Sequence, residues 1–259
     1  MNNLQALQKA RLARGPLPPV KAGLVRMRKA LVWVYRWGWS SAKILELVGG
    51  SARSGLAARL VHRGFLKATK TESGGYGGGP SALLTLTEKG LTEVEKWIED
   101  PADLLEYQLN PFRIDQSKIR HSELAQTSTA KNISNGLISD YITESMAAAK
   151  SEKNAKQHDI IWIMPDGSRQ GIEVELSAKW KRKLDQFILS CILSIKRKNV
   201  DIIFIVTDSK AIQRRYQTAF EVGKPFGKWE SSERGFAKKS GTYEVPDFME
   251  GKVLCILID

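Results

Sequence analysis

Hydrophobic residues in the first quarter of the chain recur with the spacing of short helices. They fall on one side of residues 22–35, which predicts an amphipathic helix there. Serine caps favour two further helices, a short one over 42–48 and another over 51–63, where Gly64 stops the pattern. A helix, a short helix, a tight turn and a helix have the spacing of a helix-turn-helix.

The residues that follow predict a pair of strands and a closing helix. Strands are expected over 65–70 and 82–87, on either side of a glycine-rich loop at 73–81, and a helix is expected over 87–98. The stretch Leu84-Thr85-Leu86-Thr87-Glu88-Lys89-Gly90 resembles the strand-to-helix junction after the wing of winged-helix DNA-binding proteins. That resemblance implies that the third helix lies in the major groove.

The expected DNA contacts follow from this frame. The candidate donors are Arg53, Ser54, Arg59 and Arg63 on the third helix and Lys67 and Lys70 on the strand after it. The alternative is a winged helix that is used only for contacts with other proteins.

The C-terminal half changes to a pattern of strands alternating with helices. Strands are expected over 160–164, 171–177, 201–206 and 253–258, and helices over 179–197 and 210–222. The first of these helices carries its apolar face at Trp180, Leu184, Phe187, Ile188, Cys191, Ile192 and Ile195. The fold class is therefore α/β, with a mixed sheet flanked by helices behind an α-rich N-terminal domain. No role is predicted for residues 223–250.

The expected domains are four segments. Residues 1–21 form a basic flexible arm, 22–100 the winged helix, 101–120 a connector and 121–259 the α/β domain. Helical patterns over 116–127 and 133–149 fill the centre of the chain.

Charge adds a class of partner to this picture. The 259 residues carry a net charge of +12, distributed as +9 over 1–100, −2 over 101–180 and +5 over 181–259. A basic module beside an acidic centre suggests a polyanion site in one place and a different kind of site, for example for a metal, in another. The alternative is solvated charge that serves solubility alone.

Composition also excludes several classes of protein. No run approaches the roughly 18 apolar residues of a membrane span, and no signal peptide is visible. The two cysteines, Cys191 and Cys255, make neither a disulfide framework nor a zinc site. We therefore expect a cytoplasmic protein.

Candidate chemistry lies on the second C-terminal strand. Glu173 and Glu175 alternate with apolar residues, so they share one face at a separation of ~6.6 Å. Two like charges there either face bulk water or are compensated by a cation. With Asp159 on the neighbouring strand, three carboxylates would suit Mg²⁺ or Mn²⁺. Glu-x-Glu alone on a half-exposed strand usually has no function.

The site depends on the register of the hairpin. A two-residue turn at Asp166-Gly167 would set Asp159 opposite Val174, on the wrong face. A three-residue turn with a bulge would set Asp159 opposite Glu175. The metal hypothesis therefore requires the odd-length turn or a bend near Asp159.

An acidic residue before a hairpin, Glu-x-Glu on its second strand and a basic amphipathic helix resemble the restriction-endonuclease-like nuclease fold. The usual motif is Pro-Asp followed by Asp or Glu, any residue and Lys; here His158 replaces the proline and Glu175 the lysine. With the winged helix and the pair Arg120-His121, residues 24–208 resemble plasmid mobilisation relaxases of the MobC class and the related replication-relaxation family.

This resemblance implies a relaxase that nicks one strand of duplex DNA at a plasmid transfer origin, in company with relaxosome accessory proteins. It assigns the metal to Asp159, Glu173 and Glu175, the role of the missing lysine to Lys179, and the positioning of a phosphate or water to His121. Lys181, Arg182 and Lys183 would contact the DNA backbone or form a solvated helix face.

Other mechanisms and functions compete with this one. The commoner relaxases use paired histidines and a catalytic tyrosine; His62, His121 and His158 are not paired, which excludes that mechanism. Tyr141 falls in a helical pattern and is better explained by packing. The main alternative function is a non-catalytic DNA-binding accessory protein of plasmid transfer or replication, and a weaker one is a restriction-type or transposition endonuclease.

Overall fold

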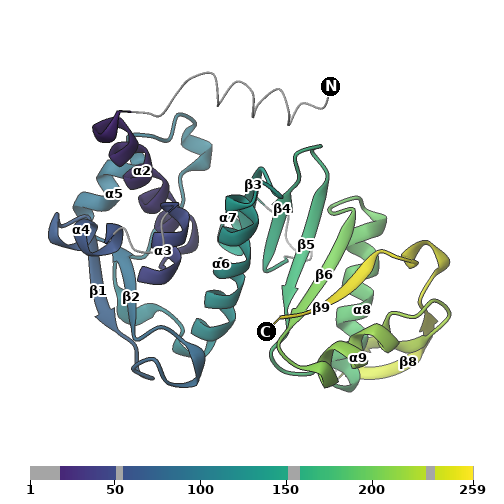
Figure 1. Ribbon diagram of the computed structural model, residues 1–259. Helices are drawn as coiled ribbons and strands as arrows, with labels where there is room; N and C mark the ends of the chain where they lie inside the picture. Colours follow the sequence, from purple (N-terminus) through teal and green to yellow (C-terminus); the bar gives the residue numbers. More distant parts are fainter. Residues whose placement is uncertain (1–17, 51–54, 151–157, 232–236, 259) are drawn as a thin grey trace. The chain divides into compact units, whose positions relative to one another are not determined.

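The computed structural model describes residues 18–50, 55–150, 158–231 and 237–258, and is a mixed α/β protein (Figure 1). The chain divides into two compact units, Met1–Ile138 and Ser139–Asp259. Each unit has a hydrophobic cluster of its own.

The N-terminal unit is built from helices and one hairpin. Its elements are α2 (Pro19–Trp37), α3 (Ala42–Val48), α4 (Leu56–His62), β1 (Leu66–Lys70), β2 (Ala82–Leu86), α5 (Glu88–Glu95) and α6 (Ile119–Ser134), with 3-10 turns at Tyr76–Gly78, Pro101–Asp103, Pro111–Arg113 and Gln116–Lys118. The predicted order of helices and strands is therefore present in this unit, but the third helix begins at Leu56 with Gly55 as its N-cap, later than the predicted start at residue 51.

The first helix begins earlier than the sequence pattern predicts. Pro19 occupies the first helical position, where its missing N–H costs no hydrogen bond, and Gly38 ends the helix at a φ of 77°. Residues 19–21 therefore belong to α2 and not to the expected flexible arm, and residues 1–17 lie outside the described residues.

The hairpin is tied to the helices at both ends. Ser40 forms an isolated antiparallel bridge with Leu84 of β2. Thr87 caps α5 by accepting the N–H of Gly90. A Cβ on Gly90 would lie 2.1 Å from the carbonyl oxygen of Phe65, so only glycine lets α5 pack this closely on the start of the hairpin.

Helix α6 belongs to the N-terminal unit. The expected domain boundary between residues 120 and 121 therefore falls inside this unit. Gln126 of α6 is fully buried and accepts hydrogen bonds from Trp33 Nε1 (2.9 Å) and Ser40 Oγ (2.8 Å). The Gln126 amide donates to the carbonyl oxygen of Trp39 (3.0 Å). These bonds hold α6 against α2 and the residues that follow α2. The sequence predicts instead that residues 101–120 separate the two as a connector.

The C-terminal unit contains a five-stranded mixed sheet. Its elements are β3 (Asp140–Thr143), α7 (Glu144–Lys150), β4 (Ile160–Ile163), β5 (Arg169–Val174), α8 (Lys181–Lys196), β6 (Ile202–Thr207), α9 (Lys210–Ala219), β7 (Pro225–Ser231), β8 (Ala237–Glu244) and β9 (Val253–Leu257), with a 3-10 turn at Asp247–Met249. The sheet order is β3-β4-β5-β6-β9. Strands β3, β4 and β5 are antiparallel in turn, and β6 and β9 continue parallel to β5.

The prediction of one helix over 133–149 is wrong. Gly136, at a φ of 69°, ends α6, and the β-favouring run Tyr141-Ile142-Thr143 pairs with β4 before α7 begins. Tyr141 is thus a strand residue opposite Trp162, buried at 4% exposure.

Both crossover helices cover the same face of the sheet. The buried side chains of α8 and α9 form one core with Ile161, Ile203 and Ile205. Register places Glu173 level with Ile205, and therefore on this helix-covered face. The opposite face carries Ile172 and Val174, which are also buried.

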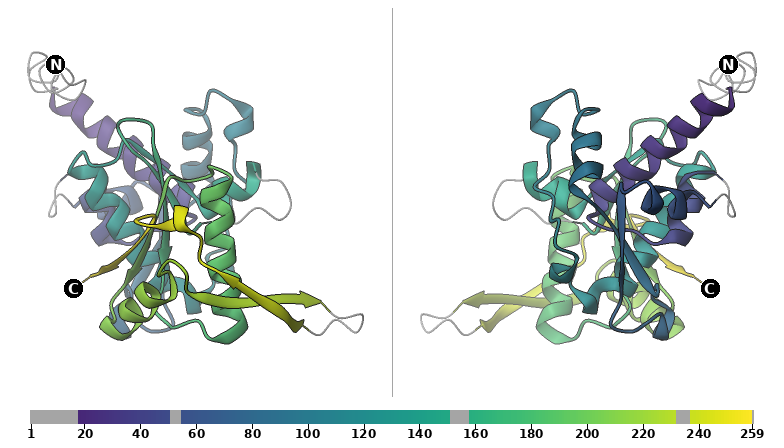
Figure 2. Two further views of the ribbon diagram at one scale, coloured as in Figure 1. Left: turned by 90° about the vertical axis from the view of Figure 1, so that its right-hand side faces the viewer. Right: turned by 90° about the vertical axis from the view of Figure 1, so that its left-hand side faces the viewer.

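The segment for which the sequence predicts no role forms a separate two-stranded hairpin, β7–β8, which extends from the C-terminal unit (Figure 2). Phe226 and Val245 anchor its base in the core, and Trp229 Nε1 donates to Asp185 on α8 (2.8 Å). The charged groups of this hairpin partly pair with one another, as Lys228 does with Glu230.

Candidate functional site

The two glutamates of the sequence motif are buried, each at 5% exposure. They alternate with apolar residues as predicted, but the face that they share is covered by α8 and α9 rather than by water. Their charges therefore require partners inside the protein.

Glu173 is held by a histidine. His158 Nδ1 donates to Glu173 Oε1 (2.6 Å), and His158 Nε2 lies 2.8 Å from Ser194 Oγ on α8. Serine, histidine and carboxylate in this order are the hydrogen-bonded sequence of a hydrolase triad. Ser194 is only 1% exposed, however, so this chain of bonds is structural: it secures β5 to α8.

Glu175 is held at both oxygens. The Lys179 ammonium group pairs with Oε1, and the Tyr216 hydroxyl donates to Oε2 (3.1 Å). The Tyr216 hydroxyl in turn accepts the N–H of Lys179 (3.3 Å). Burial raises the pKa of Tyr216 to about 12, so it remains a donor at neutral pH. Lys179 thus lies beside Glu175, and the catalytic role that the resemblance assigns to it stays a prediction.

The register of the β4–β5 hairpin determines the position of the third carboxylate, Asp159. Met164 N–H donates to Ser168, which closes a three-residue turn, and Ile160 pairs with Ile172. Continuing this register sets Asp159 level with Glu173, not opposite Val174 or Glu175 as the two predicted turns required. Asp159 Oδ2 accepts the N–H of Val174 (2.7 Å).

These residues, as they lie, do not fit a resident Mg²⁺ or Mn²⁺. Both oxygens of Glu175 and one oxygen each of Glu173 and Asp159 are occupied by protein donors. Within the described ranges, no three Asp, Glu, His or Cys side chains are grouped as metal ligands. A cation at Glu175 would require Lys179 and Tyr216 to release it.

Two remaining candidates lie away from this cluster in the sequence. His121 is a partly exposed residue of α6, in the N-terminal unit. Tyr141 is buried on β3, two strands away from β5. The chemical role of His121 stays a prediction, and the burial of Tyr141 agrees with the packing role that the sequence favours.

The candidate DNA contacts lie on α4 and β1. Arg59, Arg63, Lys67 and Lys70 are assigned to this surface, whereas Arg53 and Ser54 fall outside the described residues. The Arg63 guanidinium lies over the Phe65 ring at 5.1 Å, which holds it at the end of α4.

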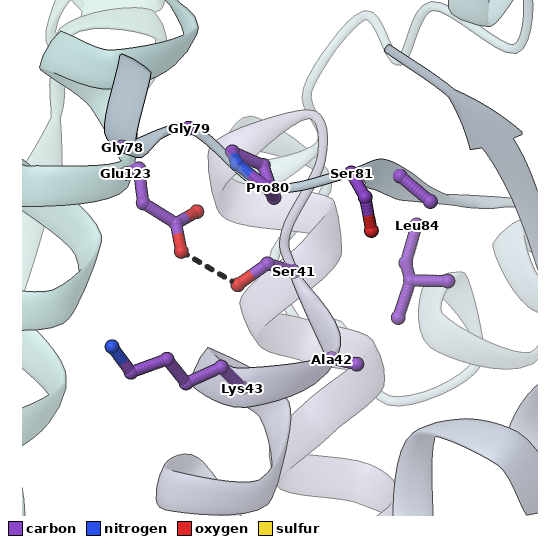
Figure 3. A pocket seen from close by; sticks show the side chains of 10 residues that line it. Ser41, Ala42, Lys43, Gly78, Gly79, Pro80, Ser81, Leu84 and Glu123 are labelled. Carbon is purple, nitrogen blue, oxygen red and sulfur yellow. Dashed lines mark hydrogen bonds between the residues drawn. The ribbon is translucent and has the colours of Figure 1, made fainter. Parts of the chain in front are cut away.

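A pocket of about 300 Å³ lies between α3, α6 and the loop that joins β1 and β2 (Figure 3). Ser41 Oγ donates to Glu123 Oε1 (2.9 Å), and Lys43 points toward the same space. Burial raises the pKa of the Glu123 carboxyl, while Ser41 and Lys43 lower it. An acid at this position makes the pocket unsuited to a DNA phosphate, and its hydrogen bond helps to fix α6 on α3.

Sequence reasoning missed two members of the hydrogen-bonded network around the glutamates, Ser194 and Tyr216. Ser194 lies 36 residues from His158, and Tyr216 lies 41 residues from Glu175. Both belong to helical patterns whose spacing indicates packing, so only the packing of α8 and α9 on the sheet could have identified them.

No family model, curated protein or solved structure matches this chain. Within the part of the chain that the structure describes, no helix is both long and apolar enough to cross a membrane.

Proposed function

We propose that the protein binds double-stranded DNA through its N-terminal unit, with α4 in the major groove. The observation that carries this proposal is the division of α4 into two faces. Leu56, Ala57 and Leu60 are buried, while Arg59, His62 and Arg63 line the outer face around the small Ala58. A narrow cationic helix face with a small residue at its centre can approach the edges of base pairs.

The surroundings of α4 support this proposal. Helices α2, α3 and α4 precede a hairpin whose strand β1 exposes Lys67 and Lys70. The loop after β1 carries Tyr76, which is 89% exposed. This order of elements is that of a winged helix, in which helix and hairpin contact adjacent parts of a duplex.

The test compares two pairs of cations in the same unit. Arg59→Ala/Arg63→Ala should weaken binding to a mixed-sequence duplex and lower the salt slope of log affinity by about 0.9 for each phosphate that is no longer neutralised. Lys118→Ala/Lys131→Ala removes the same charge from exposed positions at η4 (Gln116–Lys118) and α6, and should leave both quantities nearly unchanged. Equal decreases in the two variants would mean that only net charge matters and would refute a binding surface on α4.

The biological setting that we propose is plasmid transfer or replication, in which this protein acts as a DNA-binding accessory factor. The support for it is the resemblance of residues 24–208 to the mobilisation and replication-relaxation proteins.

Nicking of one DNA strand is a second candidate function of the C-terminal unit. The observation that favours it is that Asp159, Glu173 and Glu175 share one face at the adjoining ends of β4 and β5, but Lys179 and Tyr216 would have to release Glu175 before a cation could bind there. Supercoiled plasmid is incubated with and without Mn²⁺, using wild type, Glu173→Ala and the isosteric Glu173→Gln. Metal-dependent open circles from wild type alone would support the nuclease. If wild type gives no product while its duplex binding is intact, the accessory role is the function that remains.

A further inference from the structure

Trp180 lies on the surface of the C-terminal unit. The helical pattern predicts it on the apolar face of α8, but the helix begins one residue later, at Lys181. Trp180 is the extended N-cap residue, with φ −125° and ψ 151°, and is 65% exposed. Leaving so much apolar indole surface in water is unfavourable, and packing that surface on α8 would avoid this cost in free energy.

One face of the Trp180 ring is occupied by an arginine. The Arg215 guanidinium of α9 lies 3.6 Å from the ring centroid, and its Nε donates to the carbonyl oxygen of Lys179 (3.1 Å). The guanidinium is thus fixed between the backbone and the indole. The exposed area of Trp180 must therefore lie on the other ring face and the ring edges, and the indole is held in one orientation before any ligand arrives.

Three exposed cations directly follow Trp180 in the chain, and a fourth directly precedes its stacking partner Arg215. Lys181, Arg182 and Lys183 form the exposed first turn of α8, and Arg214 is exposed on α9. The first turn of α8 holds no acidic residue. Helix N-termini favour negative charge, so three cations there repel the helix dipole as well as one another. An anion bound at this turn would relieve both repulsions.

We propose that Trp180 and these cations form a platform for single-stranded DNA. One unstacked base lies on the open face of Trp180, and the flanking phosphates lie on Lys181, Arg182 and Lys183. A duplex cannot make this contact because its base faces are covered by their neighbours in the stack. The choice of DNA rests on the proposed function, whereas the platform itself belongs to the other unit and to different residues.

The first arm of the test removes the ring. Trp180→Ala should weaken binding of a fluorescein-labelled oligo(dT) by about 5- to 150-fold, the decrease that corresponds to the stacking of one base. Trp180→Phe keeps a ring and should lose much less affinity. Phe248→Ala removes another exposed aromatic of the same unit, 45% exposed, and should leave oligo(dT) affinity unchanged.

The second arm removes the cations, and the chain offers a matched control at the other end of the same helix. Lys181→Ala/Arg182→Ala/Lys183→Ala should reduce the salt slope for oligo(dT) by about 0.7 for each phosphate that is no longer neutralised. Lys196→Ala/Arg197→Ala/Lys198→Ala removes equal charge, and should not reduce it. Each set also includes one lysine at positive φ, Lys181 at 45° and Lys198 at 57°, so backbone strain is matched.

The outcomes separate this proposal from the proposed function. Duplex affinity should survive Trp180→Ala and fall in Arg59→Ala/Arg63→Ala, while oligo(dT) affinity should show the reverse. Failure of wild type to bind oligo(dT), or equal oligo(dT) affinity of wild type and Trp180→Ala, would overturn the platform even if duplex binding is intact. Because Trp180 is exposed, thermal melting should confirm that the variant remains folded.

Discussion

The hydrogen bonds that join Glu173, His158 and Ser194 should be most sensitive to a methyl group added at Gly171. An ideal Cβ on this β5 residue would lie 2.8 Å from both Cε1 and Nδ1 of His158 and 3.0 Å from Cγ. The imidazole cannot yield easily because it is 2% exposed and bonded at both nitrogens. Gly171→Ala must therefore move the ring away from Glu173, from Ser194 or from both.

The magnitude follows from two costs. Forcing an extra carbon into a packed core costs about 1 to 3 kcal/mol. Displacing His158 leaves the 5%-exposed Glu173 carboxylate short of a donor, which costs about 1 to 3 kcal/mol more. We expect Gly171→Ala to lower the free energy of unfolding by about 2 to 6 kcal/mol.

Equilibrium urea unfolding measures this decrease, with a second glycine as the control. Gly23, inside α2, has nothing within 4 Å of an added Cβ, so Gly23→Ala should stabilise by about 0.5 to 1 kcal/mol. If Gly171→Ala lowers the free energy of unfolding by less than about 1 kcal/mol, His158 is not too tightly packed to move and the prediction is refuted.

A double-mutant cycle identifies the cause of the decrease. In a His158→Ala background the ring is absent, so Gly171→Ala should cost almost nothing further. If the two substitutions are additive instead, the methyl group acts through some other neighbour and the argument from His158 is wrong.

Three further substitutions test the remaining contacts by urea unfolding. Tyr216→Phe removes a donor to buried Glu175 and should cost about 1 to 3 kcal/mol. Since the pKa of Tyr216 is raised from 10.0 to about 12, its contribution is complete below pH 10 and disappears as the pH rises from 10 toward 12; stability of Tyr216→Phe should fall less over that range than stability of wild type. Lys179→Met should cost about 1 to 3 kcal/mol by leaving the Glu175 carboxylate short of its cation, and adding Glu175→Gln should recover much of that stability. Gln126→Ala removes three buried hydrogen bonds from the N-terminal unit and should cost about 2 to 4 kcal/mol, whereas Gln126→Glu, which keeps the acceptor but loses the donor to Trp39, tests whether the amide itself is required.

Local signals were sufficient for most of the secondary structure. Capping and glycine punctuation located the helix over 42–48 and the β1–β2 hairpin because those signals act within a few residues. The β7–β8 hairpin escaped prediction, since polar residues dominate it and only the ends near Phe226 and Val245 reach the core. Strand β3 was hidden because its apolar positions also satisfy a helical period.

The candidate site was predictable in its members but not in its environment. Periodicity correctly put Glu173 and Glu175 on one side of a strand. Whether that side meets water or helices depends on the handed crossovers β5–α8–β6 and β6–α9–β9, which bring both helices to the same face. The need for a compensating cation was therefore a sound inference, while its source, Lys179, is part of the chain itself.

Helix α9 connects two features of the C-terminal unit, the pairing of Lys179 with buried Glu175 and the exposure of Trp180. The Tyr216 hydroxyl accepts the N–H of Lys179, and the Arg215 guanidinium donates to the Lys179 carbonyl oxygen, so both backbone groups of Lys179 are bonded to α9 side chains. These bonds fix the backbone of Lys179 directly before the extended Trp180. Successive side chains of an extended segment point to opposite sides. Lys179 therefore turns inward to Glu175 while Trp180 turns outward, so the contact that neutralises the buried glutamate also exposes the indole of the platform.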